Sequence, residues 1–145
     1  MVKGIAHACF IVRNLEETAE FYCGILGMKQ AFDYVKEGKR FGLYLHVGGR
    51  NFLELFERPH GETAERQSYQ HLSLEVDNIR EIVERLKSHG INVTEIGRGT
   101  DRSWGVKFPD PDGNLIELQE IPRKANRRHG LKRLNSERAG TCNHK

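Results

Sequence analysis

The stretch HACFIVRNLEETAEF (residues 7–21) decides the fold, because HLSLEVDNIREIVER (residues 71–85) repeats its pattern later in the chain. Each stretch opens with a histidine, continues with the β-branched and apolar residues typical of a strand, and then reaches an asparagine suited to cap a helix. The matching positions are Val12 and Val76, Asn14 and Asn78, Glu17 and Glu81, and Glu20 and Glu84. The repetition indicates that one structural unit occurs twice.

A second pair of similar stretches supports the duplication. NFLELFE (residues 51–57) and NLIELQE (residues 114–120) share an Asn, two Glu and a Leu at equivalent positions. The glutamate in the middle of each stretch lies almost equally far from the histidine that opens its half of the chain. A repeat of about 63 residues is too long for a solenoid unit and fits a duplicated half-domain.

Each half is predicted to fold as a strand, a helix and three further strands, with a glycine ending each helix. The predicted elements of the first half are a strand over 5–12, a helix over 15–26, and strands over 30–36, 41–47 and 51–57. Those of the second half are a strand over 71–76, a helix from residue 79 to Gly90, and strands over 91–96, 104–108 and 114–120. The predicted fold is therefore α+β, with two tandem βαβββ modules forming a curved, open barrel-like mixed sheet and helices on its outer face.

Composition and charge bound the organisation of the chain. We expect residues 1–121 to form one domain, with module 1 at about 4–58, a polar linker at 59–67 and module 2 at about 68–121. Residues 122–145 carry eight Lys and Arg against one Glu, so the net charge of +3 arises in this tail and the preceding residues are net acidic. Such a tail buries too little apolar surface to fold alone, and we expect it to be disordered.

Several classes of protein are disfavoured. No apolar run approaches the roughly 18 residues of a membrane-spanning helix, and the first residues lack the apolar stretch of a secretory signal, so we expect a cytoplasmic protein. The three cysteines are odd in number and scattered, which argues against a disulfide framework. The folded part shows no repeated aromatic and basic surface, so we expect no specific nucleic-acid partner.

Strand periodicity places four candidate ligands on comparable faces. Residues of like parity point to one side of a strand, so His7, Glu54, His71 and Glu117 all fall on mixed faces opposite apolar ones. Taken singly, each Glu has the alternative of facing water or pairing with an arginine, and each His that of a hydrogen-bonded packing role. Because both residue types recur at matched positions of both halves, we predict that the four bind one divalent metal ion per site.

The mixed nitrogen and oxygen ligands favour Zn, Ni, Co, Mn or Fe over calcium or a thiol-seeking metal. With four protein ligands, an octahedral ion keeps two positions for water or substrate. Such an ion polarises substrate oxygens, and a glutamate beside it can act as a general base. The set therefore suits proton transfer next to a carbonyl, with Glu54 or Glu117 as the catalytic carboxylate.

The chain resembles the vicinal oxygen chelate superfamily over residues 4–121. The resemblance rests on the duplicated βαβββ plan and on two stretches, NLEETAEFYCGILGMK (residues 14–29) and DPDGN (residues 110–114). The His/Glu/His/Glu set is most similar to glyoxalase I. The resemblance implies a metal-dependent lyase or isomerase that acts on a small carbonyl substrate, such as a thiol hemithioacetal, through a metal-bound enediolate. Other activities of the same superfamily stay open: an extradiol-type dioxygenase, a thiol transferase, or a non-catalytic drug- or metabolite-binding protein like the bleomycin-resistance members.

Two departures concern the substrate. Glyoxalase I carries Arg and Asn where this chain has Ile11 and Arg58, and those residues help to hold glutathione, so the resemblance does not extend to glutathione as cosubstrate. Arg102, Trp104 and Arg40 are candidate substrate contacts, with ordinary surface charges and a packing role for the tryptophan as the alternatives. We expect a C2 homodimer, in which each site takes one His/Glu pair from each subunit, although closure within one chain is also open.

Overall fold

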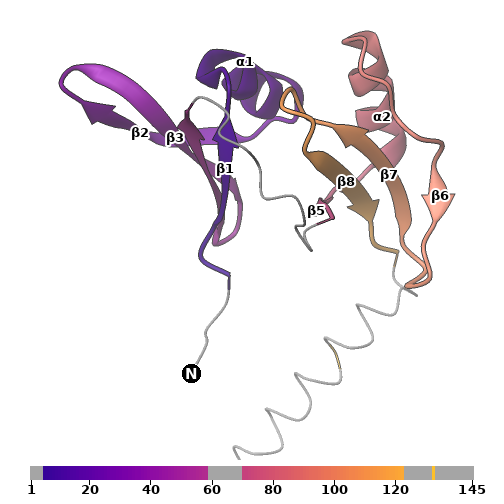
Figure 1. Cartoon of the computed structure of the whole chain (residues 1–145). Coiled ribbons are helices and arrows are strands. Elements are labelled where there is room, and N and C mark those ends of the chain that lie inside the picture. Colours follow the sequence, from indigo (N-terminus) through magenta and orange to yellow (C-terminus); the bar gives the residue numbers. More distant parts are fainter. Residues whose placement is uncertain (1–4, 59–69, 123–131, 133–145) are drawn as a thin grey trace, which may run out of the picture. The chain divides into compact units, whose positions relative to one another are not determined.

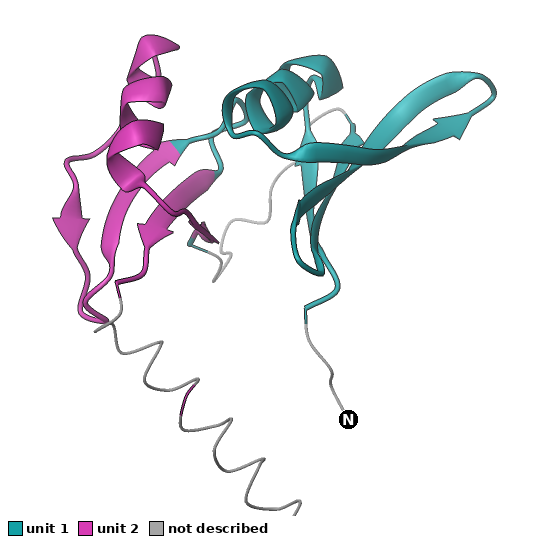
Figure 2. Ribbon diagram, turned by 180° about the vertical axis from the view of Figure 1, so that it is seen from behind, with its two compact units in different colours: residues 1–70, 109–114 teal, residues 71–108, 115–145 magenta. Residues whose placement is uncertain are grey.

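The computed structural model describes residues 5–58, 70–122 and Lys132. The chain divides into two compact units: residues 1–70 with 109–114 form unit 1, and residues 71–108 with 115–145 form unit 2 (Figure 2). Each unit contains a four-stranded mixed sheet with a helix (Figure 1), which confirms the predicted α+β fold of two βαβββ modules. The predicted linker, Cys142 and nearly all of the basic tail lie outside the described residues.

Unit 1 begins with the stretch that opens the sequence repeat. Its sheet has the strand order β1-β4-β3-β2, in which β1 and β4 are parallel and the other neighbours antiparallel. The elements are β1 (Ala8–Val12), α1 (Leu15–Ala19), the π-helical segment η1 (Glu20–Ile25), β2 (Lys29–Lys36), β3 (Lys39–Gly48) and β4 (Asn51–Glu57). The helix predicted over 15–26 is thus α-helical only in its first part; its end at Gly27, where φ is +76°, is as predicted.

Unit 2 follows the same plan, with the strand order β5-β8-β7-β6 and a parallel pair β5 and β8. Its elements are β5 (Leu72–Glu75), α2 (Ile79–Ser88), β6 (Gly97–Arg98), β7 (Trp104–Pro109) and β8 (Leu115–Glu120). The strand predicted over 91–96 is wrong, since only Gly97 and Arg98 form a ladder with β7. Thr94 pairs with Lys107 irregularly. Its backbone N–H donates to the Lys107 carbonyl at 3.0 Å, but the Lys107 N–H donates to the Thr94 hydroxyl at 2.9 Å, where a regular ladder would use a backbone carbonyl.

The duplication extends to the way each helix begins. Asn14 caps α1 and Asn78 caps α2: the Asn14 side chain accepts hydrogen bonds from two N–H groups of the first turn, and that of Asn78 from one. A glutamate from the last strand of each unit completes the cap: Glu57 accepts the Leu15 N–H at 2.8 Å, and Glu120 accepts the Ile79 N–H at 2.9 Å. The repeated Glu at the end of NFLELFE and NLIELQE is therefore a helix-capping residue in both units.

Burial alternates along the central strands as the sequence predicts. In β4, Leu53 and Leu55 are buried, whereas Glu54 and its neighbours of like parity are only partly covered. In β8, Ile116 and Leu118 are buried and Glu117 lies on the other side. The core of each unit thus lies on one face of its sheet, and the candidate ligands lie on the opposite face.

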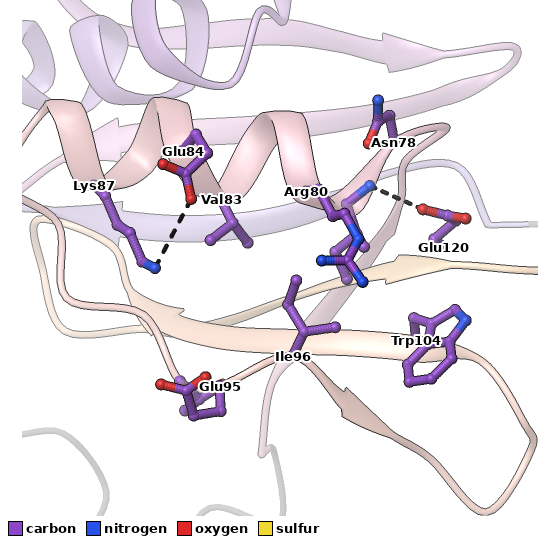
Figure 3. A pocket seen from close by; sticks show the side chains of 11 residues that line it. Asn78, Arg80, Val83, Glu84, Lys87, Glu95, Ile96, Trp104 and Glu120 are labelled. Carbon is purple, nitrogen blue, oxygen red and sulfur yellow. Dashed lines mark hydrogen bonds and ion pairs between the residues drawn. The ribbon is translucent and has the colours of Figure 1, made fainter.

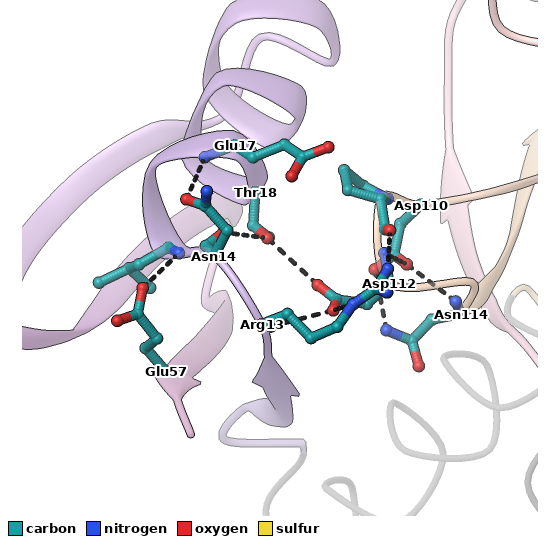
Figure 4. A network of polar contacts seen from close by, with 10 residues as sticks. Arg13, Asn14, Glu17, Thr18, Glu57, Asp110, Asp112 and Asn114 are labelled. Carbon is teal, nitrogen blue, oxygen red and sulfur yellow. Dashed lines mark hydrogen bonds and ion pairs between the residues drawn. The ribbon is translucent and has the colours of Figure 1, made fainter. Parts of the chain in front are cut away.

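The DPDGN segment is a folded loop that belongs to unit 1 (Figure 4). Asp110 is buried and accepts hydrogen bonds from the Asn114 N–H at 2.8 Å and the Tyr22 hydroxyl at 2.9 Å. Asp112 accepts from the Arg13 backbone N–H at 3.0 Å and from the Thr18 hydroxyl at 3.3 Å. The two carboxylates are therefore satisfied within the loop and by the α1 region, a structural role. Among the described helices, none is both long and apolar enough to cross a membrane.

Candidate metal centre in two halves

Unit 1 brings His7 and Glu54 together at the edge formed by β1 and β4. Cys9 lies opposite Glu54 in the parallel register, so His7, two residues earlier, is on the same face of the sheet. The His7 Nε2 atom is 3.5 Å from Glu54 Oε2. The histidine side chain is 39% exposed and that of the glutamate 15%, so the imidazole is open to solvent while the carboxylate is mostly covered.

Unit 2 builds the same pair from the corresponding elements. Ser73 lies opposite Glu117 in the parallel register of β5 and β8, and His71 stands two residues before Ser73. The His71 Nε2 atom is 3.2 Å from Glu117 Oε2. Each predicted His/Glu pair is thus formed within its own unit, by an equivalent register and with equivalent atoms.

The geometry of both pairs fits two neighbouring ligands of one transition-metal ion. Ligand atoms about 2.0–2.2 Å from a common ion lie about 2.8–3.1 Å apart at adjacent octahedral positions and about 3.3–3.6 Å apart at tetrahedral ones. The measured separations, 3.5 and 3.2 Å, lie between these outer limits. Within residues 5–58 and 70–122, no group of three or more His, Cys, Asp and Glu side chains is placed to hold an ion, and each predicted His/Glu pair lies within one unit.

Two tyrosines support the pair of unit 1, and the sequence interpretation missed both. The Tyr34 hydroxyl donates to Glu54 Oε1 at 2.7 Å, and the Tyr44 hydroxyl lies 3.4 Å from Nδ1 of His7. The hydrogen bond to Glu54 raises the pKa of Tyr34 to about 12, so its hydroxyl is a donor at neutral pH. Contacts of this kind orient metal ligands and tune their basicity. Strand parity alone would have indicated Tyr44, which lies directly opposite Glu54 in the ladder.

Cys9 is adjacent to the same pair, and its surroundings favour the protonated thiol over the thiolate. Burial, followed by the neighbouring Glu54 carboxylate, raises the pKa of the Cys9 thiol to about 11. At neutral pH this thiol is protonated, and the thiolate is the reactive form. Cys23, whose pKa burial also raises, belongs to η1. Both are free thiols.

Glu117 has different neighbours. Lys107 Nζ lies 3.7 Å from Glu117 Oε1, so the neighbour of this glutamate is a cation, whereas Glu54 is bonded to a phenol. The α-carbon of Gly105 is also close, since a Cβ added there would lie 3.6 Å from the same oxygen. Gly105 and Lys107 share a face of β7, which leaves Trp104 on the opposite face from Glu117.

Among the described contacts of the three predicted substrate-binding residues, none is with a member of either His/Glu pair. The Arg40 guanidinium forms ion pairs with Glu16 and Asp33, which turn it toward α1. Arg102 is exposed on the loop before β7, with a positive φ of 68°. Trp104 lies against Arg98, whose guanidinium carbon is 5.5 Å from the ring, and beside a cavity of about 610 Å³ along α2 (Figure 3). That cavity contains none of the four predicted ligands; its lining includes Asn78, Arg80, Lys87, Glu95 and Glu120.

Comparison with known proteins agrees with this architecture. Residues 4–118 match the family model described as the glyoxalase/bleomycin resistance protein/dioxygenase superfamily. A lactoylglutathione lyase of Neisseria meningitidis serogroup A is 34% identical over 122 residues, which cover 79% of this chain and 88% of the relative. A metallothiol transferase, FosB, of Staphylococcus epidermidis is 32% identical over 123 residues, 81% of this chain and 84% of the relative.

A solved structure described as the glyoxalase family protein from Enterococcus faecalis superimposes with a TM-score of 0.66 at 27% identity, covering 81% of this chain and 98% of that one. The two βαβββ modules and the match to the family model define the class of protein. The chain belongs to the glyoxalase/bleomycin resistance protein/dioxygenase superfamily. Its similarity to a lactoylglutathione lyase supports an enzyme of glyoxalase type, within a superfamily that also includes resistance proteins.

Proposed function

We propose that this protein is a metal-dependent, glyoxalase I-like lyase or isomerase that moves a proton next to the carbonyl of a small substrate, for example a thiol hemithioacetal. His7, Glu54, His71 and Glu117 would hold one divalent ion, with Zn, Ni, Co, Mn and Fe as the candidates. The observation that carries the proposal is the equivalence of the two pairs, with Nε2 and Oε2 atoms 3.5 and 3.2 Å apart in matching registers.

The residues of the chain would have separate roles in metal binding, proton transfer and substrate binding. When bound, the ion would act as a Lewis acid toward substrate oxygens. His7 and His71 would bind through Nε2, the atom that faces the glutamate in each pair. Glu54 or Glu117 would take the proton from the substrate carbon and return it to a neighbouring position. Lys107 and the exposed Arg102 are proposed contacts for an anionic group of the substrate.

Metal content tests the proposal most directly. The full chain, freed of metal and reloaded separately with each candidate ion, should bind about one ion per chain. Loss of a residue that only orients a metal ligand typically lowers metal affinity by about 10–100-fold. His7→Ala and His71→Ala remove a ligand itself, so each should lower metal affinity by more than that. His89→Ala is the matched control, because this histidine lies at the end of α2 and bonds to the Arg85 carbonyl. Failure of every candidate ion to bind would contradict the enzyme and favour a metal-free binding protein.

The activity assay should separate the remaining enzymes. Loaded protein would be offered hemithioacetals formed from methylglyoxal with glutathione and with other small thiols, and thioester formation followed. The similarity to FosB supports a thiol transferase as the second candidate, which would instead join a thiol to an electrophile. Consumption of oxygen with a catechol and iron would favour the dioxygenase over both.

We also propose that the protein is a homodimer whose sites are shared between subunits. The design of one half-site per unit allows a complementation test. In a heterodimer of His7→Ala and His71→Ala chains, a shared arrangement leaves one site with all four ligands, whereas closure within each chain leaves none. After random exchange of subunits, about a quarter of the wild-type metal sites should reappear if the sites are shared. No recovery despite measured subunit exchange would assign the site to a single chain.

A further inference from the structure

Unit 1 carries a large set of aromatic side chains on the face of its sheet that bears Glu54. They come from three neighbouring strands, β2, β3 and β4, and we call them the aromatic face: Phe32, Tyr34, Phe41, Tyr44, Phe52 and Phe56. The core of unit 1 lies on the other face, where Leu43, Leu53 and Leu55 are buried. The aromatic face is therefore not the packing core of the unit.

The rings are arranged as stacked layers. Phe32 stacks on Tyr44 with centroids 4.8 Å apart and planes 20° from parallel, and Tyr44 stacks on Phe52 at 5.1 Å and 22°. Phe41 and Phe56 form a second stacked pair, with planes only 10° apart. Gly42 allows the Phe56 ring to lie directly on β3, because a Cβ at that position would be 2.6 Å from the ring. A row of this kind leaves ring edges and the outer faces of its end rings open, and a further ring can pack on these edge-to-face or offset-stacked.

The aromatic face continues into the proposed metal centre. Its two tyrosines are the residues that contact the ligands, Tyr34 through Glu54 and Tyr44 through His7. The His7 ring also lies edge-on to Tyr44, with centroids 5.9 Å apart. A group bound at this His/Glu pair would therefore have the rings of Tyr34 and Tyr44 close by.

A cavity of about 970 Å³ lies on this side of unit 1. It is bounded by the stacked Tyr44 and Phe52 and by the chain segment just before His7, and its lining is Ile5, Ala6, Tyr44, Gly49, Arg50, Asn51 and Phe52. Cavities that bind small molecules typically measure about 300–1,000 Å³ and are lined mainly by apolar and aromatic groups with a few polar ones. The space is thus sufficient for a ring system.

Unit 2 shows that the fold does not require such rings. The residues around Glu117 on the same face are Ser73, Gly105 and Lys107. In unit 1, by contrast, Phe32 is 47% and Phe41 40% exposed, although large aromatic residues are usually covered. Apolar surface left open beside a polar centre is typical of a binding site.

We propose that the aromatic face holds a planar aromatic group of the substrate, so that the protein acts on an aryl-substituted carbonyl compound. The proposal rests on the proposed function, since the aromatic group is placed relative to the metal that His7 and Glu54 would help to bind. The carbonyl end of the substrate would reach that metal, and its ring would lie against the row Phe32, Tyr44 and Phe52. Stacking and burial of the ring, rather than contacts to a thiol cosubstrate, would then supply much of the specificity.

Hydroxamates that share one chelating group and differ in their apolar part test this directly. Acetohydroxamate, benzohydroxamate and 2-naphthohydroxamate would be titrated by calorimetry into the metal-loaded full-length protein, which measures binding without turnover. We expect 2-naphthohydroxamate to bind at least about tenfold more tightly than acetohydroxamate, because its larger ring system can contact several rings of the row at once. Equal affinities would overturn the aromatic subsite, while acetohydroxamate binding would still support the metal centre. If no hydroxamate binds, the proposed function and the subsite both fall.

Variants locate the effect on the aromatic face. Phe32→Leu and Phe52→Leu remove rings on either side of Tyr44 but spare the residues that contact the metal ligands. Each variant should therefore reduce the preference for the naphthyl compound about threefold or more, while its affinity for acetohydroxamate stays the same. Val35→Ala is the matched control. Val35 is exposed and lies on β2, as Phe32 does, but it pairs with Arg40, whose side chain turns toward α1, so Val35 is on the other face of the sheet. A preference unchanged in both phenylalanine variants would overturn the proposal.

Discussion

The two units place the same His/Glu pair in different surroundings. In unit 1 Glu54 is bonded to a phenol and shares its sheet face with six aromatic rings, whereas in unit 2 Glu117 is next to an ammonium group, a glycine and a serine. The features that coincide are the strand register, the helix caps and the pair itself. Duplication has therefore preserved what the fold and the proposed metal site need, and the two faces have diverged where a substrate would be recognised.

The largest expected effect separates the roles of the two glutamates. Glu54→Gln and Glu117→Gln each keep a ligand oxygen but remove a carboxylate that can accept a proton. Loss of a general base lowers turnover by about 10²–10⁴-fold, and we expect this loss for Glu54, because its unit carries the proposed substrate-binding face. Glu117→Gln should affect metal affinity more than turnover. Turnover at saturating metal, measured on the hemithioacetal that proves active, gives the comparison.

A larger loss of turnover in Glu117→Gln would assign the base to unit 2 and remove the suggested division of labour. Metal content must be measured on the same samples, since a variant without metal would report on binding alone. Lys87→Met, a change of a charged residue on the exposed side of α2, is a suitable control for surface charge.

The hydrophobic cores of the two units should respond alike. Leu55 and Leu118 occupy equivalent positions of the repeat, and both are buried. Leu55→Ala and Leu118→Ala should each lower the free energy of unfolding by about 2–5 kcal/mol, through lost burial and the cavity left behind. Urea unfolding followed by circular dichroism measures the change. A loss below about 1 kcal/mol in either variant would mean that its unit tolerates the cavity by collapsing into it.

The features predicted from the sequence are those fixed by local pattern. The His/Glu pairs followed from strand parity and from two copies of one motif, and the structure joins each pair within its unit. The aromatic face depends instead on the register of β2 against β3, which is shifted between Gln30 and Phe32 and again between Tyr34 and Val35. Sequence periodicity carries no signal for such irregularities, so Tyr34 and its hydrogen bond to Glu54 were not found.

The strand wrongly predicted over 91–96 has a similar cause. Its alternating apolar residues fit a strand, but a side-chain hydroxyl of Thr94 replaces a ladder hydrogen bond to Lys107. Competition of this kind between side chain and backbone depends on what lies opposite, which a single stretch of sequence does not contain. Arg40 likewise has its partners, Glu16 and Asp33, in other elements.

The neighbours of the two glutamates should shift metal affinity in opposite directions. Tyr34→Phe removes the hydrogen bond that orients Glu54 and should weaken metal binding by about 10–100-fold. Lys107→Met removes a cation 3.7 Å from Glu117 and should strengthen it, by only about fivefold, because the lysine side chain is partly exposed to solvent. Competition with a coloured chelator measures both affinities. If both variants changed metal affinity in the same direction, the proposed contrast between the neighbours of Glu54 and those of Glu117 would be wrong.

The smallest expected effect concerns the helix caps, where the units are most alike. Asn14 accepts hydrogen bonds from two N–H groups, of Glu16 and Glu17, both at 3.1 Å, whereas Asn78 accepts one from Glu81 at 3.3 Å. Replacing a capping asparagine by alanine typically costs about 1 kcal/mol of stability, so Asn14→Ala should lie above this value and Asn78→Ala at or below it. In both variants Glu57 or Glu120 would still accept the N–H of the first helical residue, which limits the loss of stability. Thermal unfolding at matched pH would show the difference. A larger loss of stability for Asn78→Ala than for Asn14→Ala would mean that the number and length of the cap hydrogen bonds do not set the contribution of each asparagine.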